Sequence, residues 1–162
     1  MKNKAIFLDR DGVLNVERGE YTYLPEHTKI VDGIGPALSR LQEKGYLFVI
    51  VSNQGGIAKG IYGHEDVDAV NGIIENHLRE YGVEFKAIYY CPHHPETGKC
   101  LCRKPLSLLF ERALHRFNID PALSFMIGDK QRDMDPAEKV GIKGLLIEAN
   151  TSLSALMKNS DL

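Results

Sequence analysis

Residues 4–12 of this 162-residue chain read Lys-Ala-Ile-Phe-Leu-Asp-Arg-Asp-Gly, an apolar run that ends abruptly in charged residues. The run at 4–8 predicts a short buried strand, and Asp9 and Asp11 follow directly after it. In sheets of parallel strands, ligands bind beyond the carboxyl ends of the strands. We therefore expect this stretch to place two carboxylates at a functional site.

The rest of the chain alternates between runs typical of strands and runs typical of helices. Further strands are predicted at 46–51, 85–90, 123–127 and 144–148. Apolar residues at helical spacing predict helices at 34–41, 67–81, 106–117 (behind Pro105) and about 134–140. This alternation predicts an α/β fold in which a doubly wound, mostly parallel sheet forms the middle of three layers.

Length and composition favour a single globular domain over residues 1–162. Hydrophobic residues make up 43% of the chain and charged residues 26%, and the net charge is −2. A chain without a basic excess is not expected to bind nucleic acid. The longest apolar run, at 46–51, is too short to span a membrane, and residues 5–8 are too short for a secretory signal. We expect a cytoplasmic monomer.

Polar residues follow four of the predicted strands. They are Asp9, Asp11, Ser52, Asn53, Lys104 and Asp129. Three carboxylates at one edge would repel one another unless a cation lay between them, and an oxygen-rich site suits Mg²⁺. A serine hydroxyl, backbone amides and a lysine ammonium can together hold the oxygens of a phosphoryl group. The pattern predicts Mg²⁺-dependent phosphoryl transfer.

The three cysteines of the chain lie close together in the sequence. An odd number of cysteines is a poor disulfide framework. Cys91 and His93, followed by Cys100 and Cys102, offer three thiolates and one imidazole. This is a closed tetrahedral set for a structural Zn²⁺. The alternative is three free thiols beside a surface histidine pair.

Together, these motifs resemble those of the haloacid dehalogenase superfamily of phosphatases. The resemblance covers about residues 5–148, and no insertion large enough for a cap domain interrupts it. The segments that match the four motifs are residues 6–15, Ser52, Lys104, and Gly128-Asp129 with Asp133. The resemblance implies the fold of that superfamily, without a large cap domain and with an open mouth to the site.

The same resemblance implies a two-step mechanism. Asp9 would attack phosphorus and form an aspartyl-phosphate. Asp11 would protonate the leaving oxygen and then take a proton from the attacking water. Mg²⁺ would be bound by Asp9, Asp11 and Asp129, while Ser52 and Lys104 would hold the phosphoryl oxygens.

The remaining substrate contacts are expected from side chains near these motifs. Arg103 would grip the rest of the substrate, because its planar guanidinium suits a phosphate or sugar oxygen. Arg10, Asn53 and Lys130 complete the expected substrate-binding set. The sequence assigns no role to Asp133.

The cysteine loop narrows the resemblance to the D-glycero-D-manno-heptose-1,7-bisphosphate phosphatases and the related histidinol-phosphatases. In that pattern, a structural Zn²⁺ is held by Cys91, His93, Cys100 and Cys102. Asn15 and residues 53–60 favour the heptose branch. Two features depart from its pattern: Glu20 interrupts the Gly-Tyr pair that usually follows the first motif, and the zinc loop is short.

We therefore expect a phosphate-monoester hydrolase that removes the 7-phosphate of D-glycero-D-manno-heptose 1,7-bisphosphate. Histidinol phosphate is the alternative substrate. An alternative of another class is a phosphoacceptor signalling domain. That class is disfavoured because its acceptor aspartate would end a middle strand, whereas the second strand here ends in Ser52 and Asn53.

Overall fold

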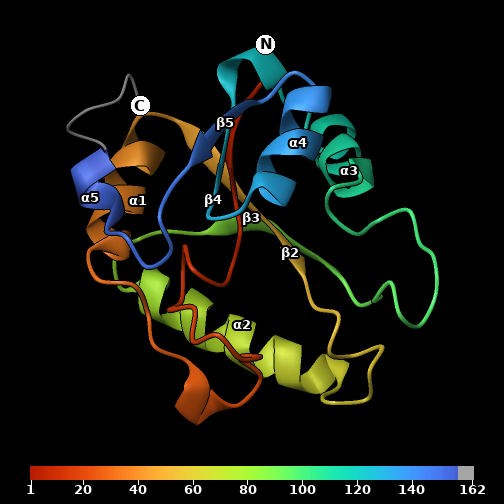
Figure 1. The fold of residues 1–162 in the computed structure, drawn as a ribbon. Helices are drawn as coiled ribbons and strands as arrows, with labels where there is room; N and C mark the ends of the chain where they lie inside the picture. The colour runs from red at the N-terminus through yellow and green to blue at the C-terminus, as the bar shows by residue number, and fades with distance from the viewer. Residues whose placement is uncertain (157–162) are drawn as a thin grey trace.

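A computed structural model describes residues 1–156, in which five strands form one fully parallel sheet (Figure 1). The order of the strands across the sheet is β3-β2-β1-β4-β5. Their bounds are Lys4–Leu8 for β1, Tyr46–Asn53 for β2, Phe85–Cys91 for β3, Phe125–Gly128 for β4 and Lys143–Leu146 for β5. The last six residues of the expected 1–162 domain lie outside the described part.

Helices cover both faces of the sheet, which confirms the predicted three layers. One face carries α1 (Ile34–Glu43), α2 (His64–Arg79) and α5 (Leu153–Leu156), and the other carries α3 (Leu108–Arg116) and α4 (Gln131–Lys139). Figure 1 shows α3 and α4 together on one side of the strands and α1 with α5 on the other. Short 3₁₀ turns at Pro25–His27 and Pro121–Leu123 complete the described elements.

Alternate side chains of β1 pack into two hydrophobic cores, one on each face of the sheet. Ile6 and Leu8 pack against α1 and α2, whereas Ala5 and Phe7 pack against α3 and α4. All four side chains are fully buried. A strand buried on both faces has no polar side to alternate with, which explains its uninterrupted apolar run.

Some boundaries differ from the sequence prediction for local reasons. The helix expected at 106–117 begins at Leu108, with Ser107 as its N-cap: the carbonyl of Ser107 accepts the first helical hydrogen bond, from the N–H of Glu111, at 3.0 Å. The strand expected from 123 begins at 125, since residues 121–123 form a 3₁₀ turn.

The topology fixes the place of the site. β1 lies between β2 and β4, so the chain winds outward from β1 in two directions. Connections leave such a sheet on opposite sides of this switch point and open a crevice there, beyond the carboxyl ends of the strands. Asp9 follows β1, and Asp129 follows β4. The sheet therefore brings residues 120 positions apart to one edge.

We expect Leu38→Ala to lower the free energy of unfolding by about 2–5 kcal/mol, because it leaves a cavity between α1 and the sheet. Leu38 is 0% exposed, whereas Leu123 is 53% exposed. Leu123→Ala is the matched control and should change stability by less than about 0.5 kcal/mol. Urea denaturation of both variants measures the difference, and equal losses would contradict the assigned core.

Candidate active site

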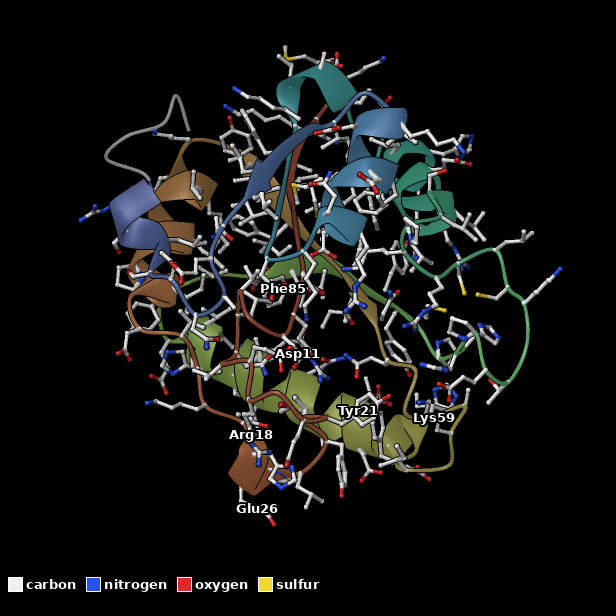
Figure 2. All side chains as sticks on the ribbon, viewed as in Figure 1. Asp11, Arg18, Tyr21, Glu26, Lys59 and Phe85 are labelled. Atoms are coloured by element: carbon white, nitrogen blue, oxygen red, sulfur yellow. The ribbon has the colours of Figure 1, made fainter. Side chains whose placement is uncertain are left out.

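A pocket of about 430 Å³ opens at the carboxyl edge of the sheet. It is lined by Asp9, Asp11, Glu17, Gly19, Glu20, Tyr21, Thr22, Asn53, Gln54, Lys104, Lys130 and Arg132. In Figure 2, Asp11 lies near the middle of the view, and Tyr21 lies nearer the lower edge. The pocket thus joins the expected strand-end residues to the loop that follows β1.

A buried ion-pair cluster forms the floor of this pocket. Lys104 Nζ lies 3.0 Å from Asp9 Oδ1 and 2.6 Å from Asp133 Oδ1, and it donates to the carbonyl of Val51 at 2.7 Å. Burial acts to lower the pKa of Lys104, but the two carboxylates outweigh burial and raise it. The ammonium is therefore charged and fixed in place beside Asp9.

The carboxylate of Asp9 is held in an environment that disfavours its charge. Burial raises the pKa of Asp9 to about 6; Lys104 acts in the opposite direction, and Asp133 and Asp11 add to the increase. The backbone N–H of Arg10 donates to Asp9 Oδ1 at 2.8 Å and fixes the side chain. A cation bound nearby would favour the ionised form that a nucleophile needs.

Three carboxylates at the pocket floor fit a divalent cation. Asp9, Asp129 and Asp133 each present an oxygen within 4.8 Å of the others. Asp129 Oδ1 is buried and has no hydrogen-bond partner. Lys104 neutralises at most one of the three charges, and oxygen ligands of this kind suit Mg²⁺.

The carboxylate set differs from the expected one in one member. Asp9 and Asp129 lie where we expected them, but Asp133 completes the cluster in place of the Asp11 side chain. Asp11 is turned instead toward Asn15 Nδ2 at 2.8 Å and the Arg10 guanidinium. The sequence assigned no role to Asp133, which the first turn of α4 brings back toward β1.

Gly12 lets the loop after β1 pass close to this cluster. Its φ is +88°, and a Cβ at this position would lie 2.8 Å from Asp129 Oδ2. A side chain here would strain the backbone and push Asp129 away. A glycine is therefore required at position 12 of the first motif, because Asp129 of the fourth motif lies directly against it.

The side chain of Arg10, expected to bind substrate, points into the protein. It is 1% exposed, pairs with Asp11 Oδ2 at 3.1 Å and donates to the carbonyl of Thr22 at 2.8 Å. Nε and Nη2 of the guanidinium bond Asp11 and the loop that follows β1, whereas Nη1 is buried without a hydrogen-bond partner. Arg10 thus supports the pocket from beneath, and its contact with substrate stays a prediction.

Ser52 and Asn53 follow each other at the end of β2 and differ in exposure. Ser52 is 2% exposed, and its hydroxyl accepts from Gln54 Nε2 at 3.4 Å. Asn53 lines the pocket, and its amide bonds both the N–H and the C=O of Lys104, at 3.0 and 3.1 Å. Asn53 thus anchors the loop that delivers Lys104.

The two other residues expected to contact substrate, Lys130 and Arg103, lie in different parts of the structure. Lys130 lines the pocket, where its Nζ is 3.4 Å from Glu17 Oε2 and 3.7 Å from Asp129 Oδ2. Arg103 lies beside the cysteine loop and donates to the carbonyl of His93 at 2.9 Å. Glu17 lies outside the four motifs, in the loop near residues 17–23 that the sequence predicts at the mouth of the site, and it lines the pocket.

The structure brings all four expected zinc ligands together. Atoms of Cys91, His93, Cys100 and Cys102 lie within 4.8 Å of one another. Cys91 Sγ is 3.1 Å from Cys102 Sγ and 3.7 Å from Cys100 Sγ, and the three cysteines are free thiols. Burial and then the thiol of Cys102 raise the pKa of Cys91, so a bound cation would be needed to keep the thiolate.

Known proteins are similar to this chain in sequence. A family model described as HAD-hydrolase-like matches residues 101–160. D-glycero-beta-D-manno-heptose-1,7-bisphosphate 7-phosphatase from Haemophilus ducreyi is 43% identical, over 96% of this chain and 88% of its own length. The enzyme of that name from Vibrio cholerae is 43% identical over 88% and 79%.

A solved structure agrees with these relatives. D,D-heptose 1,7-bisphosphate phosphatase from B. bronchiseptica, complexed with magnesium and phosphate, has a TM-score of 0.85 and 30% identity, and the match covers 97% of this chain and 87% of that one. The fold and the carboxylate site define a phosphatase of the haloacid dehalogenase-like class. Within that class, this chain belongs to the D-glycero-beta-D-manno-heptose-1,7-bisphosphate 7-phosphatase family.

Phosphatases of this class use Mg²⁺, and the cysteine-histidine cluster has the ligands to hold zinc. No helix within residues 1–156 is long and apolar enough to cross a membrane.

We expect Mg²⁺ to raise the melting temperature, because it relieves the repulsion among the three carboxylates. At ten times its Kd, the ion adds about 1.4 kcal/mol, or about 3–6 °C for a domain of this size. The raised pKa values of Asp9 and Asp129 mean that protons compete with the ion, so the shift should grow as the pH rises from about 5 to 7.

Differential scanning fluorimetry with and without Mg²⁺ measures this shift. Asp129→Asn should reduce it at a given Mg²⁺ concentration, whereas Asp32→Asn, on the exposed turn before α1, should not. A full shift in Asp129→Asn would place the cation elsewhere.

Adjacent histidines offer a direct test of the zinc cluster. His93→Ala should lower the zinc content from about one ion per chain, because it removes one of four ligands. His94→Ala should keep the metal, since His94 lies outside the cluster and accepts from the N–H of Glu96. Elemental analysis of purified protein decides the matter, and equal zinc in both variants would rule out His93 as a ligand.

Proposed function

We propose that this enzyme hydrolyses the 7-phosphate of D-glycero-β-D-manno-heptose 1,7-bisphosphate through an aspartyl-phosphate on Asp9. The observation that carries the proposal is the position of Asp9. Its carboxylate lies on the pocket floor, 3.0 Å from the buried ammonium of Lys104 and among the carboxylates that fit Mg²⁺. The names of the relatives supply the identity of the sugar.

The first step forms a bond between an Asp9 oxygen and phosphorus and breaks the bond from phosphorus to the sugar oxygen. Asp11, which lines the same pocket, gives a proton to that leaving oxygen. In the second step, Asp11 takes a proton from water while the water oxygen attacks phosphorus and the bond to Asp9 breaks. Inorganic phosphate leaves, and both aspartates return to their first state.

The charges around the pocket floor suit a transferred phosphoryl group. The ammonium of Lys104 lies beside Asp9 and would place a positive charge next to the phosphoryl oxygens, and Asn53 keeps the backbone of Lys104 in place. Asp9, Asp129 and Asp133 would hold Mg²⁺, which neutralises charge on the phosphoryl oxygens when bound. Electrostatic stabilisation and alignment account for most of the catalysis in such reactions.

The proposed zinc has a structural role in this scheme. Cys102 directly precedes Arg103 and Lys104 in the chain. A metal bound by Cys102 would hold the segment that presents the catalytic lysine, and four protein ligands leave no open position for substrate.

A phosphoacceptor signalling domain is not supported, but for a reason other than the one expected. In the sheet, Asp9 ends the central strand, so the position of the strand does not separate the two classes. Membership of a phosphatase family separates them.

A phosphate-release assay over D-glycero-β-D-manno-heptose 1,7-bisphosphate, sugar monophosphates and histidinol phosphate tests the proposal. We expect the highest kcat/KM for the heptose bisphosphate. Asp9→Asn should lower kcat more than about 1000-fold, because the amide cannot form the phosphoenzyme. Asp32→Asn is the charge-matched control. A preference for histidinol phosphate would overturn the substrate, and an active Asp9→Asn enzyme would overturn the mechanism.

A further inference from the structure

Two hydrogen bonds connect a buried tyrosine to the acid-base carboxylate. The hydroxyl of Tyr62 donates to Gln54 Oε1 at 2.8 Å, and Gln54 Nε2 donates to Asp11 Oδ2 at 3.2 Å. Gln54 is 2% exposed and Tyr62 is 7% exposed. Water therefore competes little for the bond between Tyr62 and Gln54, whereas the Asp11 carboxylate, whose side chain is 24% exposed, faces the pocket.

An amide has a donor end and an acceptor end, and the difference matters beside a carboxylate. Once Asp11 has given up its proton, its carboxylate can only accept hydrogen bonds, and the NH₂ end of Gln54 already faces it. The hydroxyl of Tyr62 meets the opposite end and donates to its oxygen. Burial raises the pKa of Tyr62 to about 12, so the hydroxyl keeps the proton it donates.

The ring of Tyr62 is itself held on two sides. A Cβ at Gly56 would lie 2.1 Å from Cε1 of the ring, so the ring rests directly on the backbone of the loop after β2. On another side it stacks on Tyr23, with ring centroids 5.2 Å apart and an interplanar angle of 11°. The hydroxyl is thus presented from a fixed position.

The partners of Asp11 approach from two directions. Arg10 and Asn15, which are 1% and 0% exposed, contact the carboxylate from the interior. Gln54 lines the pocket together with Asp11. The amide of Gln54 therefore sets the position of the carboxylate on the side from which substrate arrives.

We propose that Gln54 and Tyr62 are positioning residues for proton transfer by Asp11, with Tyr62 fixing which end of the Gln54 amide faces that carboxylate. As the proton passes from Asp11 to the leaving oxygen, the NH₂ group of Gln54 donates to the carboxylate left behind. A flipped amide would present its carbonyl oxygen and repel that charge. The inference rests on the proposed function, because it requires Asp11 to act as the acid.

Leaving groups of different basicity isolate this role. A sugar alkoxide needs a proton as it leaves, whereas p-nitrophenolate does not. The value of kcat/KM covers the steps up to the formation of the phosphoenzyme. Tyr62→Phe should lower kcat/KM about 10-fold for the heptose bisphosphate and less than about 2-fold for p-nitrophenyl phosphate.

Matched variants complete the experiment. Tyr23→Phe removes a hydroxyl from the stacked neighbour and should leave both kcat/KM values near those of the wild type. Gln54→Met, which has no donor, should show the same split as Tyr62→Phe with a larger loss. The Mg²⁺-dependent rise in melting temperature shows that each variant is folded.

Equal losses on both esters, or no loss on either, would overturn the inference while the proposed function stands. A wild-type enzyme that hydrolyses neither ester would overturn both.

Discussion

The buried pairing of Lys104 with Asp9 and Asp133 is the interaction on which the rest of this enzyme depends. It joins three segments that lie far apart in the chain, at distances of 3.0 and 2.6 Å. Losing one partner would leave an uncompensated charge in the interior, which is strongly destabilising. The same pairing fixes a positive charge beside Asp9, the proposed nucleophile. In the proposed mechanism, stability and catalysis therefore use one set of contacts.

The loops around this cluster are held by hydrogen bonds within the protein. The amide of Asn53 bonds the backbone of Lys104 on both sides, and the guanidinium of Arg10 joins Asp11 to the loop at Thr22. Gly12 allows the loop after β1 to approach Asp129. Pre-organisation of this kind matters because phosphoryl transfer depends on alignment and on fixed charges.

Sequence reasoning worked best where the fold rule and the motif gave the same answer. The parallel sheet predicts that strand ends meet, and Asp9, Lys104 and Asp129 do meet at one edge. Sequence reasoning worked less well for the direction in which a side chain points. Arg10 is charged and directly follows Asp9, yet its side chain is 1% exposed and turned inward. Burial of a charged group depends on a partner such as Asp11, and sequence position alone does not show which partner is close enough.

The sequence by itself determined the alternation of strands and helices, the edge at which the site forms and the four members of the cysteine-histidine cluster. These follow from periodicity, from the rule for parallel sheets and from local spacing. Tertiary structure alone decided that Asp133, which the sequence placed in the fourth motif without a role, joins the carboxylate cluster, and that Tyr62 reaches Asp11 through Gln54. Such contacts depend on loop paths and side-chain rotamers, which are set by packing across the whole molecule.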